Sequence, residues 1–354
     1  MIVSGIGLMD VCNRARSGRR HERLEVHATL PESHTSDAVS SLRHPSYQAV
    51  NVWHDHDENP LNCPGCLYHY TSIDALLGMM KDRGQHLELR ATHYAYLNDY
   101  SEIRHGLNVI RADASRWVHS IAFGAQDNDF QLRGKHALKW LHDDFPLSHQ
   151  LFVSCFSEHG NLLSQWRAYT RPNKGLSLRF DRERLEAFMA RHGFLMYRCE
   201  YLPEHKLGDY RYHFMSRMIG AAKDADASNA QPSAVPSPEH YHELFNTFTD
   251  EILRTAVAIK HPAFAEEREW RFVSRNLTSE ELKHRVQFRD GATSVIPYLS
   301  LCTANDEQLP LNGIAVGPTP FVRQSMEALR TFLSAAGRSD IPVSDSGVPF
   351  RSQS

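Results

Sequence analysis

A histidine and a carboxylate–guanidinium pair are the residues of this chain whose types and spacing could carry chemistry. His69 stands where an expected strand ends and a helix begins. Glu269 and Arg271 alternate along a later expected strand, so both side chains should lie on one face of it. A guanidinium can hold a phosphate through two hydrogen bonds, and a histidine can donate or accept one. The alternatives are a histidine that only bridges strand and helix, and an exposed ion pair of little energetic weight.

The stretch 67–80 predicts how His69 is positioned. Ser72 can cap a helix, Asp74 suits its first turn, and Gly84 suits its C-terminal cap. Apolar residues at the spacing i, i+3, i+4 and i+7 predict one buried helix face: Ile73, Leu76, Leu77 and Met80.

Alternating and continuous apolar runs predict the other elements. We expect further strands at 86–92, 151–158, 175–181, 195–202, 269–273, 294–301, 312–317 and 341–343. We expect helices after residue 102, near 138–141, and at 160–169, 181–191, 209–223, 239–260 and 321–335. The polar stretch 124–136 is expected to be a loop. Asp99 and Glu102 have the spacing of a capping box, and Asn98 beside them is either a neighbour of the cap or a cleft hydrogen-bonding residue.

Composition is typical of a globular protein with a sizeable core. The chain has 354 residues, 41% of them hydrophobic, and a formal net charge of −3, which gives no bulk sign of nucleic-acid binding. No apolar run is long enough to span a membrane, and the first 11 residues lack the basic segment of a signal peptide. Six scattered cysteines favour a cytoplasmic protein with reduced thiols.

Two regions divide the sequence. Residues 1–58 are polar and rich in arginine, which predicts a poorly ordered extension or, alternatively, a nucleic-acid-binding arm. Residues 59–354 are expected to form a single domain with a helical insertion at about 205–260. Its fold class should be α+β, with a mixed, mostly antiparallel sheet and packed helices.

Metal binding is not expected. Cys63 and Cys66 form a CxxC, but no second CxxC follows, and the nearby His54 and His56 are wrongly spaced for one helical face. The closest approach to a magnesium-binding carboxylate cluster, as a nuclease would need, is Glu266, Glu267 and Glu269.

Several separated motifs occur in a fixed order: HYTSxxALL from His69, LNDxxE from Leu97, FVSCFSE from Phe152, QWRxY from Gln165, and EREWRF from Glu267. In this succession the chain resembles the DUF2971 family, an uncharacterised bacterial family, over roughly residues 67–351. This resemblance implies no activity by itself.

The opening motif is also similar to the DarT-like and RNA 2′-phosphotransferase branches of the ADP-ribosyltransferases. That resemblance implies an ADP-ribosyltransferase-like core in which His69 holds the adenosine ribose of NAD. It implies that Glu269 contacts the nicotinamide ribose, where a fixed carboxylate stabilises the oxocarbenium ion formed on bond cleavage. The remaining cofactor-binding residues that it implies come from the first strand, the middle strand, the helix after it and the late strand: Tyr70, Thr71, Ser154, Phe156, Ser157, Trp166, Tyr169 and Arg271.

The middle strand departs from the Ser-Thr-Ser pattern of that superfamily, so the assignment is an analogy. Tyr70, Trp166 or Tyr169 could stack on a base or nicotinamide ring, although tryptophans such as Trp166 and Trp270 are more often core residues. The leading expectation is therefore an ADP-ribosyltransferase-like enzyme that cleaves NAD and modifies an unknown macromolecular target, with a role in bacterial defence. The alternative is a non-enzymatic protein that binds NAD, another nucleotide or nucleic acid in the same cleft.

Overall fold

The computed structural model describes one compact unit within residues 56–354. The described residues are 65–81, 86–97, 102–122, 128–146, 149–203, 210–228, 238–291, 294–303 and 310–349. The expectations for the N-terminal extension and for several single residues lie outside this part of the chain: residues 1–58, His54, His56, Cys63, Gly84, Asn98 and Asp99.

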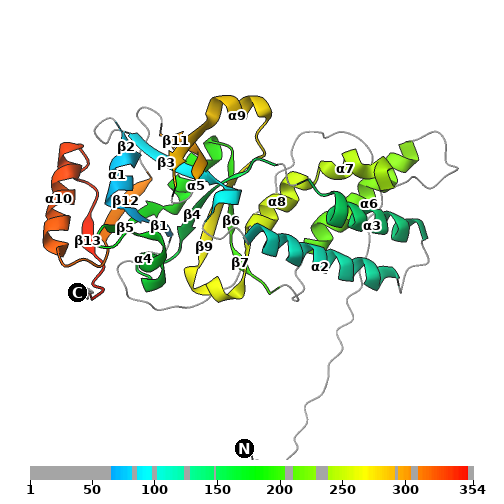
Figure 1. The fold of residues 1–354 in the computed structure, drawn as a ribbon, viewed down its shortest axis with the longest axis horizontal. Helices are drawn as coiled ribbons and strands as arrows, with labels where there is room; N and C mark the ends of the chain where they lie inside the picture. The colour runs from blue at the N-terminus through cyan, green and yellow to red at the C-terminus, as the bar shows by residue number, and fades with distance from the viewer. Residues whose placement is uncertain are drawn as a thin grey trace, which may run out of the picture. The chain divides into compact units, whose positions relative to one another are not determined.

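The main sheet is mixed and mostly antiparallel, as the sequence predicts (Figure 1). Its principal strands run in the order β10-β11-β3-β4-β1-β5-β12-β13, while β9 pairs with β4 and with β6. Short strands β7 and β8 pair in parallel beside it. The bounds are β1 (Cys66–Ser72), β2 (Met80–Lys81), β3 (His86–His93), β4 (Phe152–Ser157), β5 (Gly175–Asp181), β6 (Phe194–Arg198), β7 (Glu200–Tyr201), β8 (Ile259–Lys260), β9 (Glu269–Ser274), β10 (Val286–Asp290), β11 (Val295–Cys302), β12 (Leu311–Val316) and β13 (Val343–Asp345).

Helices pack on the sheet and also against one another. In Figure 1, α1 and α10 lie at one end of the sheet, and α2, α3, α6, α7 and α8 gather beyond β9. The bounds are α1 (Ile73–Met79), α2 (Glu102–Ala122), α3 (Asn128–Lys139), α4 (Leu163–Tyr169), α5 (Arg182–Arg191), α6 (Tyr210–Ser228), α7 (His242–Asn246), α8 (Thr249–Val257), α9 (Ser279–Arg285) and α10 (Val322–Ala335). A 3-10 turn, Pro262–Glu267, leads into β9.

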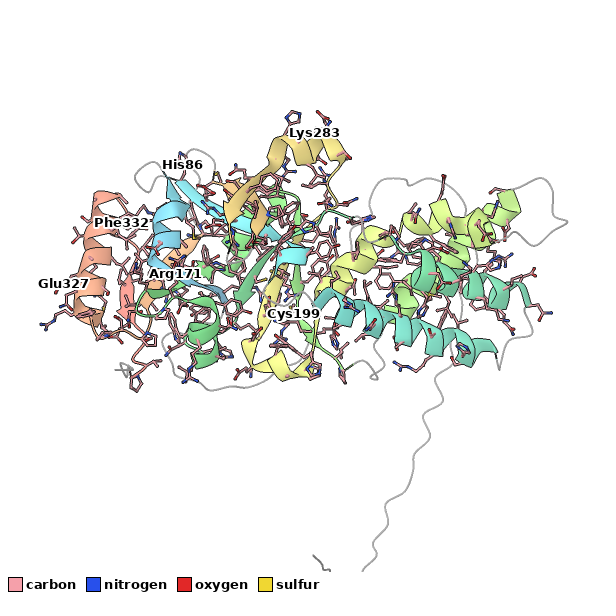
Figure 2. All side chains as sticks on the ribbon, viewed as in Figure 1. His86, Arg171, Cys199, Lys283, Glu327 and Phe332 are labelled. Carbon is pink, nitrogen blue, oxygen red and sulfur yellow. The ribbon has the colours of Figure 1, made fainter. Side chains whose placement is uncertain are left out.

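Two hydrophobic cores follow from this arrangement. The first lies under α1, α5 and α10 and includes Phe156 and Phe272 of the sheet. On α10, the partly buried Phe332 packs on this core, whereas Glu327 is exposed (Figure 2). The second core joins α2, α3, α6 and α8 to the opposite side chains of β4 and β9, among them Val273. The expected insertion at 205–260 therefore packs together with α2 and α3 as one helical layer.

The helix after His69 begins as predicted but ends early. The Ser72 hydroxyl accepts a hydrogen bond from the Ala75 amide at 3.4 Å, so the expected cap is confirmed. The prediction that Leu77 is buried is wrong, because its side chain is 52% exposed and Met79 is buried instead. Met80 leaves the helix to pair with β3, which cuts the helix short of the expected end.

The expected loop at 124–136 is also wrong over much of its length, since α3 starts at Asn128. Phe130 packs edge-on against Trp117 of α2, and Gly134 lies against Val118 and Ile219. Tertiary packing thus makes a helix of a stretch whose own polarity predicts a loop.

The bounds of most other expected elements agree with the structure to within a few residues. Two stretches are divided: the helix expected at 239–260 is split between α7 and α8 and ends in β8, and the strand expected at 195–202 is split between β6 and β7. Over the part of the chain that the structure describes, no helix combines the length and the apolar character needed to cross a bilayer.

Candidate functional site

The main sheet forks at β4. One edge of β4 pairs with β9 along its length. On the other edge, Phe152 and Val153 pair with β3, whereas Ser157 at the far end pairs with β1. Strands β3 and β1 therefore diverge from one another along the middle of β4.

A cavity of about 210 Å³ involves residues from all three strands of this fork. Residues from β9, β10, α4, the turn after β3 and the turn before β9 complete its wall. The lining residues are Tyr68, His69, Tyr70, Arg90, Thr92, Tyr96, Leu97, Val153, Ser154, Cys155, Phe156, Ser157, Gln165, Tyr169, Glu267, Glu269, Arg271 and Arg289.

His69 links two strands of the fork, β1 and β4. Its Nδ1 lies 2.9 Å from the carbonyl oxygen of Cys155, so Nδ1 carries the proton and donates it to that carbonyl. Burial lowers the pKa of His69, an effect that this hydrogen bond only partly offsets. The ring is therefore neutral at pH 7, and Nε2 is a hydrogen-bond acceptor. The bridge that His69 makes joins β1 to β4, which corrects the expectation of a bridge between strand and helix.

Glu269 belongs to a buried network of four charged side chains. Lys260 Nζ donates to Glu267 Oε2 and to Glu269 Oε2, each at 2.5 Å. Arg271 Nε donates to Glu269 Oε1 at 2.8 Å, and its Nη2 lies 3.2 Å from Oε2. Arg271 also donates through Nη1 to the carbonyl oxygen of Val257. Two acids and two bases are thus balanced in one cluster.

This geometry corrects the expectation that Glu269 and Arg271 form an exposed ion pair. Glu269 is 6% exposed and Arg271 is 2% exposed. Burial alone would raise the pKa of Glu269, but the charges of Arg271 and Lys260 outweigh burial and hold this pKa at about 2. Glu269 is consequently a carboxylate over the whole physiological range of pH.

The backbone around Glu269 is held on both sides. Its amide donates to the Tyr201 hydroxyl at 2.7 Å, and the Ser157 hydroxyl donates to the carbonyl oxygen of Glu267 at 2.7 Å. Arg268 between the two acids has a left-handed backbone with φ of 42°, which is uncommon for a residue other than glycine. Strained backbone of this kind is a recurring feature of functional sites.

Aromatic residues divide into lining and packing groups. Tyr169 lines the cavity and is 37% exposed, and burial together with the nearby Glu267 and Glu269 raises its pKa. Tyr70 also lines the cavity, but its hydroxyl donates to the His159 carbonyl at 2.8 Å and so serves the loop after β4.

Trp166, which was expected among the cofactor-binding residues, does not line the cavity. Its ring packs edge-on against Tyr70 at 4.9 Å and lies against Gly317, where an added Cβ would come within 2.7 Å of it. Its indole N–H donates to the Asn161 side chain at 2.9 Å. Thr71, the next residue of β1, is likewise not among the residues that line the cavity.

The middle strand brings three expected residues to the cavity. Ser154 and Ser157 are buried and line it. Phe156 reaches it from the first core, where its ring lies 5.4 Å from that of His69 and edge-on to Phe180. Eight of the ten expected site residues therefore meet at one cavity.

Several lining residues and one supporting residue were not predicted. Arg90 lies on a strand that was expected, whereas Arg289 lies on β10, which was not expected. Nothing in the sequence indicated that these two strands are close. Gln165 and Tyr96 sit in a short helix and a turn. Lys260 is a buried cation that precedes Glu267 by seven residues and Glu269 by nine. The turn between them brings the three groups together.

The arrangement of the acids does not resemble the carboxylate cluster of a nuclease. The carboxylates of Glu267 and Glu269 share the ammonium group of Lys260. Among the described residues, no group of three or more histidine, cysteine, aspartate or glutamate side chains could hold a metal ion.

The DUF2971 sequence model, described as a protein of unknown function, matches residues 165–272. This span confirms the resemblance over the part from α4 to β9, and it supplies Gln165, Tyr169, Glu267, Glu269 and Arg271 to the cavity. No curated protein and no solved structure matches the chain.

Proposed function

We propose that this chain, which belongs to the DUF2971 family, binds NAD or a related nucleotide in the cavity at the β4 fork and cleaves its N-glycosidic bond, as an ADP-ribosyltransferase does. One observation carries the proposal: His69 and Glu269, which are far apart in the sequence, line the same cavity. The similarity of the opening motif to ADP-ribosyltransferases assigns both residues to NAD, and a shared cavity is what that assignment requires.

His69 suits the recognition of a ribose hydroxyl. Its protonated Nδ1 is committed to the Cys155 carbonyl, so the tautomer and the ring orientation are fixed before a ligand arrives. Nε2 then accepts a hydrogen bond from a hydroxyl donor. A neutral ring is needed for this role, and the lowered pKa of His69 provides it.

Glu269 suits the reacting end of the ligand. When the bond between ribose and nicotinamide breaks, its electron pair leaves with the nicotinamide nitrogen and positive charge develops on the ribose. A carboxylate that is ionised and already oriented stabilises this charge without reorganising. Lys260 and Arg271 supply the orientation through one hydrogen bond each to the two oxygens of Glu269, besides the longer Nη2 contact.

The cavity size and its aromatic residues fit part of a dinucleotide. A volume of about 210 Å³ is below the roughly 300–1,000 Å³ typical of pockets that enclose a whole drug-sized ligand. The partly exposed rings of Tyr96 and Tyr169 line it and can pack on a base or a nicotinamide ring. We therefore place one nucleoside half in the cavity and the other half outside it.

Binding without chemistry is the second candidate function. It is favoured by the charge balance of the network, because Lys260 and Arg271 offset the negative charges of Glu267 and Glu269. A carboxylate neutralised in this way stabilises an adjacent cation less than a free one does.

The experiment is nicotinamide release from labelled NAD by wild-type protein, Glu269→Gln and the control Glu327→Gln, an exposed residue of α10 (Figure 2). We expect Glu269→Gln to lower the rate by about 100-fold or more, and the control to match the wild type. Circular dichroism checks that each variant is folded. Equal rates in Glu269→Gln would remove this residue from the mechanism, while NAD binding without release would support the second candidate function.

A further inference from the structure

Two arginines from separate strands line the β3–β10 side of the cavity. Strand β11 lies between β3 and β10, with Arg90 opposite Ser300 and Arg289 opposite Ile296. Opposed residues of antiparallel strands point to the same face, as do residues two apart on one strand. Arg90, Tyr298 and Arg289 therefore share one face of the sheet, and both arginines reach the cavity wall.

Contacts among the described residues leave donor groups of both arginines available. Arg90 uses Nε to bond Glu88 at 3.0 Å, and its guanidinium lies 4.9 Å from the centre of the Tyr298 ring. No hydrogen bond joins its two Nη groups to a described residue. Arg289 makes neither a hydrogen bond nor an ion pair with any described residue.

The two guanidinium groups also act on one another. Partial desolvation lowers the pKa of Arg289 although its side chain is exposed, and the positive charge of Arg90 lowers this pKa further. Glu88 balances Arg90, and the buried network at the other side of the cavity balances itself, so the charge of Arg289 is left over. An anion between Arg90 and Arg289 would relieve this repulsion and accept charge-assisted hydrogen bonds from both.

We propose that Arg90 and Arg289 form a phosphate subsite that holds the phosphate of a nucleotide whose nucleoside occupies the cavity. This inference rests on the proposed function, because it assigns a ligand class to the same cavity. A small ligand fits better than a nucleic-acid strand, because the site is one cavity of about 210 Å³ in a chain whose formal net charge is −3. The aromatic rings that line the cavity suit the base of such a ligand.

The test compares ligands that differ only in phosphate. Calorimetry would measure the affinity of the wild type and of Arg289→Gln for nicotinamide mononucleotide against nicotinamide riboside, and for ADP against adenosine. The arginine is exposed on β10, so its loss should leave the fold intact. We expect Arg289→Gln to weaken binding of the two phosphorylated ligands by about 10- to 100-fold and to leave the nucleosides unchanged. Arg323→Gln, an exposed change on α10, should leave all four affinities unchanged.

Three results would overturn the subsite. The first is an equal loss of affinity for nucleosides and nucleotides in Arg289→Gln, and the second is no loss of affinity for either. The third is a wild type that binds the phosphorylated ligands no better than the nucleosides, including the case in which it binds none of the four. Failure of the proposed function looks different. In that case the phosphorylated ligands bind in an Arg289-dependent way, but NAD releases no nicotinamide.

Discussion

At the scale of single residues, the buried charge network is the feature that separates this cavity from an ordinary polar crevice. Four charges are removed from water and hydrogen-bonded to one another, an arrangement that is costly to form and more costly to break. The sequence pattern correctly placed Glu269 and Arg271 on one strand face. It could not show that they are buried or that Lys260 joins them, because this depends on a turn with a left-handed residue at Arg268.

Lys260→Met should therefore be strongly destabilising. The substitution keeps much of the side-chain volume but leaves the Glu267 carboxylate buried without its cation, which costs about 3–5 kcal/mol. Urea denaturation would measure the loss. The matched control is Lys283→Met, since Lys283 pairs with Glu280 at the surface of α9 (Figure 2) and such pairs contribute about 0–1 kcal/mol. If Lys260→Met lowered the free energy of unfolding as little as the control does, the hydrogen bonds of Lys260 to Glu267 and Glu269 would not be formed in solution.

At the scale of elements, periodicity predicted where helices and strands lie better than which faces they bury. The strand at 175–181 agrees with the structure at both ends, and it pairs with β1 along one edge and with β12 along the other. The prediction of which face of α1 is buried was wrong. This helix has only two turns and runs directly into a strand, so it buries Leu76 and Met79 rather than a full apolar stripe. The fork at β4 could not be predicted, because strand pairing between distant segments leaves no local signal.

The facing of α1 gives a paired prediction. Leu76 is fully buried in the first core, so Leu76→Ala should cost about 2–5 kcal/mol in the free energy of unfolding. Leu77 is half exposed, and Leu77→Ala should cost less than about 1 kcal/mol. Chemical denaturation of the two variants would decide. Similar losses in the free energy of unfolding at the two positions would mean that Leu77 is buried, as the apolar spacing predicts.

The packing of helices within the helical layer gives a second paired prediction. A Cβ on Gly106 of α2 would lie 2.0 Å from the Ala256 carbonyl oxygen of α8, so Gly106→Ala should force these helices apart. Gly220 of α6 has open space around it, and Gly220→Ala should stabilise the helix by about 0.5–1 kcal/mol. Thermal melting would show opposite signs for the two changes. A neutral Gly106→Ala would contradict the close packing of α2 on α8.

At the scale of the whole molecule, the domain has two cores on opposite sides of one sheet, and the cavity opens where the sheet splits. The sequence predicted the α+β class and most elements. It treated the helices after residue 205 as a separate insertion, because it read 124–136 as a loop and so missed the partner that α6 packs against. Residues of the cavity come from segments between residues 68 and 289, so the domain must fold completely before the site exists.

Stability should fall as the pH is lowered from 7 to 5. Burial lowers the pKa of His69 and of His192, and it lowers the pKa of His93 to about 4. In the unfolded chain these groups bind protons at about pH 6.5, so below that pH protons favour unfolding. Glu269 contributes in the same direction but only at lower pH, since its pKa is about 2. Urea denaturation at pH 7.5, 6.5 and 5.5 would measure the slope, and a flat or rising profile would contradict these burials.

The central claim is that His69 and Glu269 belong to one ligand site, and a double-mutant cycle on NAD affinity tests it most directly. Calorimetry would compare the wild type with His69→Asn, Glu269→Gln, the double variant and the exposed control Glu327→Gln. We predict that each single change weakens NAD binding by about tenfold or more, that the double variant departs from the sum of the two single effects, and that the control binds like the wild type. NAD affinity that is unchanged in both single variants, or strictly additive losses in the double variant, would contradict a shared site.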